Sequence, residues 1–281
     1  MPIHATAVID SKAEISESAD IGPYVIIDGP VRVGPRVRIY AGAYLSGWTE
    51  IGEDCEIHPH AVIGHLPQDF HFEGHRSYCR IGAGTIIREH STIHRGTQPE
   101  SVTSLGKQCF LLANAHVGHN CEIGDNVKLY NNTLIAGHAI INDNVIVSAA
   151  AMVHQFCRIG ENAFVSAAAR IKQDLPPYLI GAFESTCVSY NAIGLRRSGL
   201  FSPDEISEVR RVFRALYRTR QSFTNAAEAL RANVSQRTGR RILEFIATPS
   251  RLGIIRGRMG AHAGETEFES AASIGDASIE D

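Results

Sequence analysis

Residues 117–158 read VGHNCE, IGDNVK, LYNNTL, IAGHAI, INDNVI, VSAAAM and VHQFCR when they are divided into units of six, and each unit begins with an aliphatic residue. The same period occupies residues 3–68 and 81–98, and it runs from residue 105 to residue 176. An α-helix repeats every 3.6 residues and cannot produce this pattern. A parallel β-helix can, because short strands alternate with tight turns and each aliphatic side chain stacks on its counterpart one coil above.

Two interruptions divide the repeat, at residues 69–80 and 99–104, and both lengths are multiples of six. Insertions in repeat proteins project as loops and commonly carry binding residues. The fifth hexad position is usually small, and we expect it to face the interior. Four of the six cysteines occupy it: Cys55, Cys109, Cys121 and Cys157. The cysteines form no C-x-x-C pair, so neither a zinc ribbon nor a redox motif is indicated.

The end of the repeat sets the expected domain boundaries. The β-helix is expected over residues 1–177, because consecutive prolines at 176–177 cannot continue a hydrogen-bonded ladder. A connector spans 178–201. From Ser202 the apolar spacing becomes helical and follows a capping-box sequence, which predicts a small α-helical domain over 202–258, with Gly239 separating its last two helices. Residues 259–281, rich in Gly, Ala, Ser and acids, predict a disordered acidic tail.

Charge is unevenly distributed along the chain. Lys plus Arg total 27 and Asp plus Glu total 30, a net charge of -3 that gives no reason to expect nucleic acid. Residues 196–258, however, hold fourteen Arg, no Lys and five acids. A basic segment suggests a surface for an anionic partner, although a solvated helix face would also account for it. No signal peptide and no transmembrane segment is evident, so we expect a cytoplasmic protein.

Histidine is the residue type that suggests chemistry. His116, His119, His138 and His154 lie close together in the second half of the repeat. If three hexads make one coil, His138 follows His119 by one coil and one residue, so the two can occupy neighbouring rungs. Such side chains can simply be solvated. Three imidazoles could instead hold zinc, and one could act as a general base. The spacing does not separate these alternatives.

Five segments together carry a family resemblance: IHRGT (93–97), NAHVGHNC (114–121), AGH (136–138), VHQFC (153–157) and QDLPPY (173–178). Over roughly residues 3–200 the chain resembles the acyl-carrier-protein:UDP-N-acetylglucosamine O-acyltransferases, the first enzymes of lipid A biosynthesis. The resemblance implies a mainly β fold, a left-handed parallel β-helix followed by a small C-terminal α-helical domain, and a homotrimer. It also implies transfer of an (R)-3-hydroxyacyl group from acyl carrier protein to the glucosamine 3-hydroxyl of UDP-N-acetylglucosamine, with no metal and no cofactor.

The resemblance also assigns roles to residues. It makes His119 the general base and the Gly137 N–H the donor to the tetrahedral oxyanion. It implies substrate contacts by His116, His138, His154, Gln155, Gln68, Asp69, Asn191, Arg196 and Arg197. The side chains implied to limit acyl-chain length are Phe164, Ser166 and Ala167. The arginine-rich helices would face acyl carrier protein, which is acidic.

The sequence departs from the family pattern in two places, and other functions remain open. Asn120 follows the expected base where an Asp is common, and an amide can orient the ring but cannot offset its charge. Ile193 and Ser198 replace an acid and an arginine, which puts the nucleotide contacts in doubt. The alternatives are N-acylation of a 3-amino UDP-sugar, a zinc carbonic anhydrase and a non-catalytic trimeric scaffold.

Overall fold

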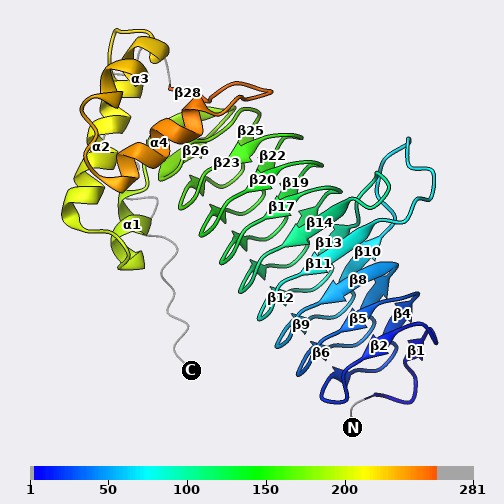
Figure 1. Cartoon of the computed structure of the whole chain (residues 1–281). Coiled ribbons are helices and arrows are strands. Elements are labelled where there is room, and N and C mark those ends of the chain that lie inside the picture. The colour runs from blue at the N-terminus through cyan, green and yellow to red at the C-terminus, as the bar shows by residue number, and fades with distance from the viewer. Residues whose placement is uncertain (1–2, 258–281) are drawn as a thin grey trace.

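The computed structural model describes residues 3–257, which form a three-sided β-helix with helices at its C-terminal end (Figure 1). The hexads form strands, most of them only two residues long, and each strand pairs in parallel with the strand one coil later. Val8 pairs with Ile26 and Glu14 with Arg32, so one coil consists of three hexads. The predicted fold class, a left-handed β-helix with a small helical domain, is confirmed.

Each flat side of the prism is one sheet, and we name the three sides A, B and C. Side A contains β3 (Asp20–Ile21), β6 (Arg38–Ile39), β9 (Glu56–Ile57), β12 (Ile86–Ile87), β15 (Phe110–Leu111), β18 (Lys128–Leu129), β21 (Ile146–Val147), β24 (Phe164–Val165), β26 (Leu179–Ala182), β27 (Thr186–Tyr190) and β28 (Arg256–Gly257). Side B contains β1 (Val8–Ile9), β4 (Ile26–Asp28), β7 (Tyr44–Ser46), β10 (Val62–His65), β13 (Thr92–His94), β16 (His116–Val117), β19 (Leu134–Ile135), β22 (Met152–Val153) and β25 (Arg170–Ile171). Side C contains β2 (Glu14–Ile15), β5 (Arg32–Val33), β8 (Trp48–Ile51), β11 (Tyr78–Ile81), β14 (Val102–Leu105), β17 (Glu122–Ile123), β20 (Ile140–Ile141) and β23 (Arg158–Ile159).

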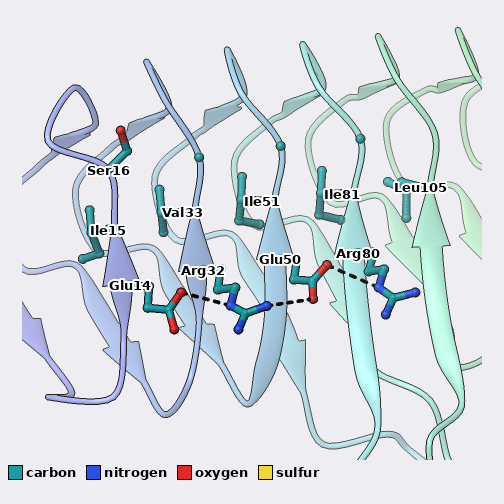
Figure 2. Close-up of a pocket in the computed structure, with 13 residues that line it drawn as sticks. Glu14, Ile15, Ser16, Arg32, Val33, Glu50, Ile51, Arg80, Ile81 and Leu105 are labelled. Carbon is teal, nitrogen blue, oxygen red and sulfur yellow. Dashed lines mark hydrogen bonds and ion pairs between the residues drawn. The ribbon is translucent and has the colours of Figure 1, made fainter.

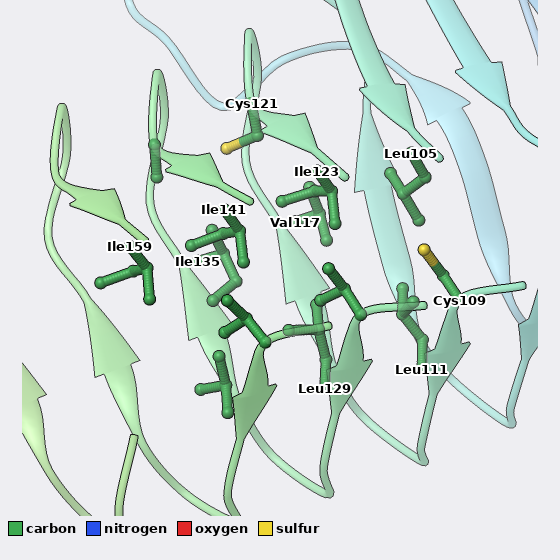
Figure 3. Packing of buried hydrophobic residues seen from close by; sticks show 14 of the residues in the cluster. Leu105, Cys109, Leu111, Val117, Cys121, Ile123, Leu129, Ile135, Ile141 and Ile159 are labelled. Atoms are coloured by element: carbon green, nitrogen blue, oxygen red, sulfur yellow. The ribbon is translucent and has the colours of Figure 1, made fainter. Parts of the chain in front are cut away.

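The core is the stack of first-position aliphatic residues inside the prism. Val117 and Ile135 are fully buried, and Figure 3 shows them in one column with their counterparts on the other sides. Burying such a side chain contributes roughly 1.5–3 kcal/mol, and the coils repeat this contribution. All six cysteines are buried thiols, as expected for the four at the fifth hexad position. The Sγ atoms of Cys109 and Cys121 lie among these apolar side chains (Figure 3).

The two insertions leave the helical register unchanged. Val62 pairs with Thr92, one coil plus twelve residues later, and Tyr78 pairs with Val102, one coil plus six residues later. The loops themselves occupy residues 66–77 and 95–101, somewhat earlier than the hexad phase alone predicts. The loops end earlier because strands β11 and β14 begin earlier than the hexad phase predicts. Both strands continue the parallel ladder of β8. Both loops leave the edge between sides B and C, and the first projects from the β-helix (Figure 1).

The prolines at 176–177 end the coils but not the sheet. Strand β26 still pairs with β24 in parallel, β27 returns antiparallel to β26, and β28 joins β27 after the helices. The connector over 178–201 therefore contains the two strands β26 and β27. Strand β26 can form because it begins after the prolines, where each residue again has a backbone N–H to donate. Helix α1 (Ala192–Ser198) follows, and Asn191 caps its N-terminus by accepting the Gly194 N–H at 3.0 Å.

The helical domain consists of α2 (Pro203–Tyr217), α3 (Phe223–Arg231) and α4 (Arg237–Ala247). The predicted capping box is present at Ser202, and Val209 and Val212 bury the apolar face of α2. Gly239 does not separate two helices. It lies inside α4, where a Cβ would come within 2.5 Å of Glu208 Oε1, so the glycine allows α4 to approach α2.

Two further observations complete the description. Within residues 3–257, no helix is long and apolar enough to cross a membrane. The acidic tail predicted over 259–281 lies outside the described residues.

Candidate active site

A row of aromatic rings runs along the edge between sides B and C, which we call the BC edge. The His119 and His138 rings meet edge to face with centroids 5.2 Å apart, and His138 stacks on Phe156 at 4.8 Å. Both His138 and Phe156 have left-handed backbone conformations, with φ values of 60° and 67°. This conformation recurs at the fourth hexad position of most turns, for example at Asn126 and Asn144, so it belongs to the turn of the β-helix. The neighbouring rungs predicted for the two histidines are observed.

The hydrogen bonds around Asn120 determine which nitrogen of His119 carries a proton. Asn120 Oδ1 accepts the Thr97 N–H at 3.0 Å and the Thr97 hydroxyl at 2.9 Å. A backbone N–H can only donate, so the atom facing Thr97 must be the amide oxygen. His119 Nδ1 lies 3.0 Å from the same oxygen and must therefore be the protonated nitrogen. The lone pair of the neutral ring is then on Nε2, as a general base requires.

Two glycines make room beside this ring. A Cβ on Gly137 would lie 2.6 Å from Cε1 and 2.7 Å from Nε2 of His119, so the imidazole rests against the bare Gly137 backbone. A Cβ on Gly118 would lie 2.8 Å from the Gly137 nitrogen. The Gly137 N–H has no hydrogen-bond partner among residues 3–257. It is therefore open to a ligand beside Nε2 of His119.

The loop over residues 66–77 brings a carboxylate toward the ring row. Asp69 Oδ1 accepts the His71 N–H at 2.9 Å. This hydrogen bond forms an Asx-type turn, which is a local structural role for Asp69. This hydrogen bond lowers the pKa of Asp69, and the positive charge of His119 contributes to the same shift. Asp69 thus lies close enough to His119 for a positive charge on that ring to act on its carboxylate. Gln68 beside it is exposed.

A second pair of histidines lies on side B next to the row. His116 Nδ1 is 2.7 Å from the Thr92 hydroxyl, and its ring meets that of His94 edge to face at 5.2 Å. Burial lowers the pKa of His116, and the charge of His119 lowers it further. Burial also lowers the pKa of His94 to about 4, so His94 is neutral near pH 7. Both rings therefore serve as uncharged neighbours of His119.

The next coil adds exposed polar groups to the same edge. His154 is exposed and its Nδ1 lies 3.0 Å from the Gln155 carbonyl oxygen. Because a carbonyl accepts, Nδ1 carries the proton there and Nε2 is left to accept from a ligand. The structure thus gathers most of the predicted site on one edge: Gln68, Asp69, His116, His119, Gly137, His138, His154 and Gln155.

The remaining predicted residues lie on other parts of the prism. Phe164 belongs to β24 on side A, and Ser166 and Ala167 form the corner that follows it, between sides A and B. Asn191 donates from Nδ2 to the Asn162 carbonyl at 3.0 Å, at the corner between sides C and A. A single chain therefore does not bring these residues to His119.

Arg196 and Arg197 occupy the last turn of α1, the helix that Asn191 caps, and both side chains are exposed. They lie on the helix that begins at the Asn191 corner. Both ends of the Asn191 amide already serve the local structure, one as the helix cap and one as the donor to Asn162.

The charged side chains of side C form a separate feature. Glu14, Arg32, Glu50 and Arg80 make an alternating ladder of ion pairs along a shallow hollow (Figure 2). No predicted site residue lines this hollow. Exposed pairs of this kind contribute little to stability.

Thr97 and Gly118 were missed by the sequence reasoning as individual site residues. Thr97 occupies the fifth position of its hexad and Gly118 the second, where small residues and glycine are expected for purely structural reasons. Their positions therefore carried no distinguishing signal. Only the contact of Thr97 with Asn120, and the short distance from Gly118 to Gly137, reveals their roles.

Comparison with known proteins identifies the family. The second domain of UDP-N-acetylglucosamine O-acyltransferase matches residues 174–255, and bacterial transferase hexapeptide repeats match residues 30–65 and 103–137. The acyl-[acyl-carrier-protein]–UDP-N-acetylglucosamine O-acyltransferase of Paraburkholderia xenovorans is 39% identical, with 90% of this chain and 99% of that protein covered. Within residues 3–257, no three His, Cys, Asp or Glu side chains are grouped to hold a metal ion.

Solved structures agree with this assignment. The UDP-N-acetylglucosamine acyltransferase of Francisella novicida has a TM-score of 0.86 and 35% identity, over 92% of this chain and 95% of that one. The enzyme of the same name from Bacteroides fragilis has a TM-score of 0.86 and 36% identity, over 90% and 100% of the two chains. The chain therefore belongs to the acyl-[acyl-carrier-protein]–UDP-N-acetylglucosamine O-acyltransferase family.

Proposed function

We propose that this chain transfers an (R)-3-hydroxyacyl group from acyl carrier protein to the glucosamine 3-hydroxyl of UDP-N-acetylglucosamine, with His119 as general base. Membership of the family supports the reaction, which is the first step of lipid A biosynthesis. The observation that carries the role of His119 is its hydrogen bond to Asn120, which leaves the Nε2 lone pair beside the open Gly137 N–H.

The reaction follows from these two groups. His119 Nε2 takes the proton of the 3-hydroxyl while the sugar oxygen attacks the thioester carbonyl carbon. The carbonyl oxygen becomes an oxyanion, which accepts a hydrogen bond from the Gly137 N–H. When the intermediate collapses, the carbon–sulfur bond breaks and the thiolate takes the proton from Nε2. The products are the 3-O-acyl sugar nucleotide and the free thiol of acyl carrier protein.

The neighbours of His119 determine how the imidazolium is stabilised. Asn120 orients the ring without contributing a charge, because its oxygen is held by Thr97. The nearby carboxylate is that of Asp69, which approaches from the loop over 66–77. In this chain the loop therefore supplies part of the negative charge that an aspartate at position 120 would have provided.

The distribution of predicted residues over three corners supports a site shared between protomers of a homotrimer. His119 lies on the BC edge, Ala167 at the corner between sides A and B, and Asn191 at the corner between sides C and A. Residues on different corners of one prism can line one site only if a second copy packs against the BC edge. Phe164, Ser166 and Ala167 of a neighbouring protomer would then reach the acyl chain, and Asn191, Arg196 and Arg197 the nucleotide.

The helical domain supports docking of an acidic carrier protein. Several exposed arginines form no ion pair with any residue among 3–257: Arg196, Arg210, Arg220, Arg231 and Arg240. Exposed cations of one sign attract an anionic partner at long range. A location in the cytoplasm stays a prediction of the sequence.

The first experiment mixes purified protein with UDP-N-acetylglucosamine and a series of 3-hydroxyacyl-acyl carrier proteins of different chain length. Product mass identifies the acyl group, and base lability distinguishes an ester from the amide that a 3-amino acceptor would give. We expect one ester-linked hydroxyacyl group and loss of product with His119→Ala. Unchanged activity of His119→Ala would exclude this residue as the base.

Ala167→Gly tests the acyl-chain contact in the same assay. Removing the methyl group enlarges the space at this corner, so the preference should move toward longer donors. An unchanged preference would exclude Ala167 from the acyl site, while activity itself would still report on His119.

Mixed trimers test the shared site. Co-expression of a His119→Ala chain with an Arg196→Ala chain, each expected to be inactive alone, should restore part of the activity, because some interfaces then combine two intact contributions. Absence of any restoration in demonstrably mixed trimers would place both residues in one protomer's site and contradict the proposal.

A further inference from the structure

An exposed cation lies at the C-terminal end of the ring row. Arg251, in the segment after α4, places its guanidinium carbon 3.7 Å from the centroid of the Phe156 ring. Phe156 in turn stacks with His138, which meets His119. The positive charge of Arg251 is among the causes, after burial and the charge of His119, that lower the pKa of His138. Arg251 is thus electrostatically coupled to the row that carries the base.

The cation has no compensating partner within the part of the chain that the structure describes, residues 3–257. Arg251 is exposed and makes no hydrogen bond or ion pair with any residue among 3–257. Its neighbour Arg158 differs, because it is bound to the buried Asp174 at 2.7 Å. A guanidinium stacked on an aromatic face keeps its N–H donors in its own plane and available for a planar, bidentate acceptor. The arrangement suits a phosphate group.

The backbone holds Arg251 at this position. The Asp174 N–H donates to the Gly253 carbonyl at 2.9 Å, and the Ile255 N–H donates to the Asp174 carbonyl at 2.9 Å. These bonds fasten the segment to the last coil, next to the corner that contains Phe156. The guanidinium is therefore presented by a fixed backbone, which limits the entropy lost on binding.

We propose that Arg251 binds the phosphate of the phosphopantetheine arm of the acyl donor, an assignment that rests on the proposed function. Successive contacts of 5.2, 4.8 and 3.7 Å join the His119 ring to the guanidinium, with the rings of His138 and Phe156 between them. The thioester must lie at His119, and the long pantetheine chain separates it from its phosphate. The diphosphate of the sugar nucleotide is only one sugar ring from the 3-hydroxyl and would lie nearer to the base.

Two minimal donors test this assignment: an (R)-3-hydroxyacyl-phosphopantetheine and the matching (R)-3-hydroxyacyl-pantetheine, which lacks the phosphate. Arg251→Gln should lower kcat/KM for the phosphorylated donor about tenfold, as expected for one charge-assisted contact. It should leave kcat/KM for the pantetheine donor unchanged. Arg251→Lys should retain part of the preference. The control is Arg38→Gln, an exposed arginine of the N-terminal coils, which should change neither value.

The outcomes separate the possible sources of phosphate. Equal losses with both donors, together with a raised KM for UDP-N-acetylglucosamine, would assign Arg251 to the acceptor and overturn the proposal. Unchanged values for both donors would also overturn it. If the wild-type protein acylates with neither these donors nor acyl carrier protein, the proposed function itself fails, and the assignment of Arg251 fails with it.

Discussion

Glycine at position 137 is required by a neighbouring ring rather than by its own backbone angles. Its φ is not in the left-handed region, but the His119 imidazole occupies the space where a Cβ would lie. The same residue also carries the N–H that we assign to the oxyanion. One residue therefore combines two demands, close approach and hydrogen-bond donation, that no residue with a side chain can meet here.

Gly137→Ala should lower kcat by about 100-fold or more, because the added methyl group displaces the base from beside the N–H donor. The matched control is Gly34→Ala in the N-terminal coils, where the new Cβ also meets a backbone atom, Ile51 O, at 2.9 Å. Both variants should lose comparable thermal stability, but only Gly137→Ala should lose activity. Full activity of Gly137→Ala would exclude the close packing of His119.

Asn120→Asp should shift the acidic limb of the pH–rate profile to higher pH by about one unit. The carboxylate keeps the hydrogen bonds to Thr97 and His119 and adds a negative charge 3.0 Å from Nδ1, which favours the imidazolium. Asn120→Leu is the control, since it removes the hydrogen bond that orients the ring and adds no charge, and it should lower kcat at every pH. A profile of Asn120→Asp that coincides with the wild type would show that residue 120 does not act on the base.

We predict that the folded protein loses stability in mild acid because of His94. Its pKa of about 4 in the folded protein lies below its ordinary value of 6.5, so the unfolded chain binds the proton more readily between these values. Stability is full above about pH 6.5 and falls as pH decreases toward 4, by about 2 kcal/mol at pH 5. His94→Gln should flatten this dependence in urea denaturation between pH 7 and 5. An equally steep dependence in His94→Gln would assign it to other groups.

At the scale of elements, the last coil depends on one buried ion pair. Asp174 is 1% exposed and binds both the backbone N–H and Nε of Arg158, at 2.8 and 2.7 Å. Its own backbone groups hold the segment around Gly253. The prolines that follow prevent another coil, so Asp174 and the returning segment together close the end of the β-helix.

Asp174→Asn should cost about 3 kcal/mol, because it leaves the largely buried guanidinium of Arg158 without its charge partner. Hydrogen exchange should accelerate in residues 250–257 before it does so in the N-terminal coils. Uniform exchange along the chain would indicate that the ion pair does not fasten this segment in particular. Arg170→Gln, which breaks an exposed pair with Glu184, provides the comparison.

Some elements of the fold can be predicted from the local sequence, and others depend on contacts with distant residues. The hexads predict the strands and the inward side chains, because each coil repeats the same local requirements, an aliphatic first residue and a tight turn. The prediction that Gly239 marks a helix boundary is wrong, because the reason for the glycine is Glu208 on another helix. The continuation of the sheet through β26 and β27 likewise depends on pairing with β24, which lies before the prolines in the chain.

At the scale of the whole molecule, the three sides differ in what they expose. Side B leaves large apolar side chains on its outer surface, among them Ile26, Leu134 and Met152, which are 41%, 43% and 38% exposed. Side C instead carries the alternating charges of Figure 2. Apolar groups aligned on one flat surface favour packing against another copy. The surface pattern therefore favours side B as part of the contact in the proposed trimer.

Leu134→Glu should yield a smaller species in sedimentation and lower the activity, because it introduces a charge into that contact. Circular dichroism should remain that of a β-helix, since the side chain lies outside the prism. Glu122→Lys on side C, also exposed, is the control and should leave the assembly unchanged. A Leu134→Glu protein that sediments like the wild type would exclude this part of side B from the contact.

The sequence by itself determined the β-helix, its phase across both insertions, the inward cysteines and the histidines of one edge, because a strict period repeats the same local physics in every coil. It also carried the family resemblance through short motifs. Only the tertiary structure revealed that Thr97 fixes the Asn120 amide, that Gly137 lies under the His119 ring, and that Arg251 caps the ring row. These contacts join residues from different coils or domains, and their geometry depends on the packing of the whole chain rather than on local spacing.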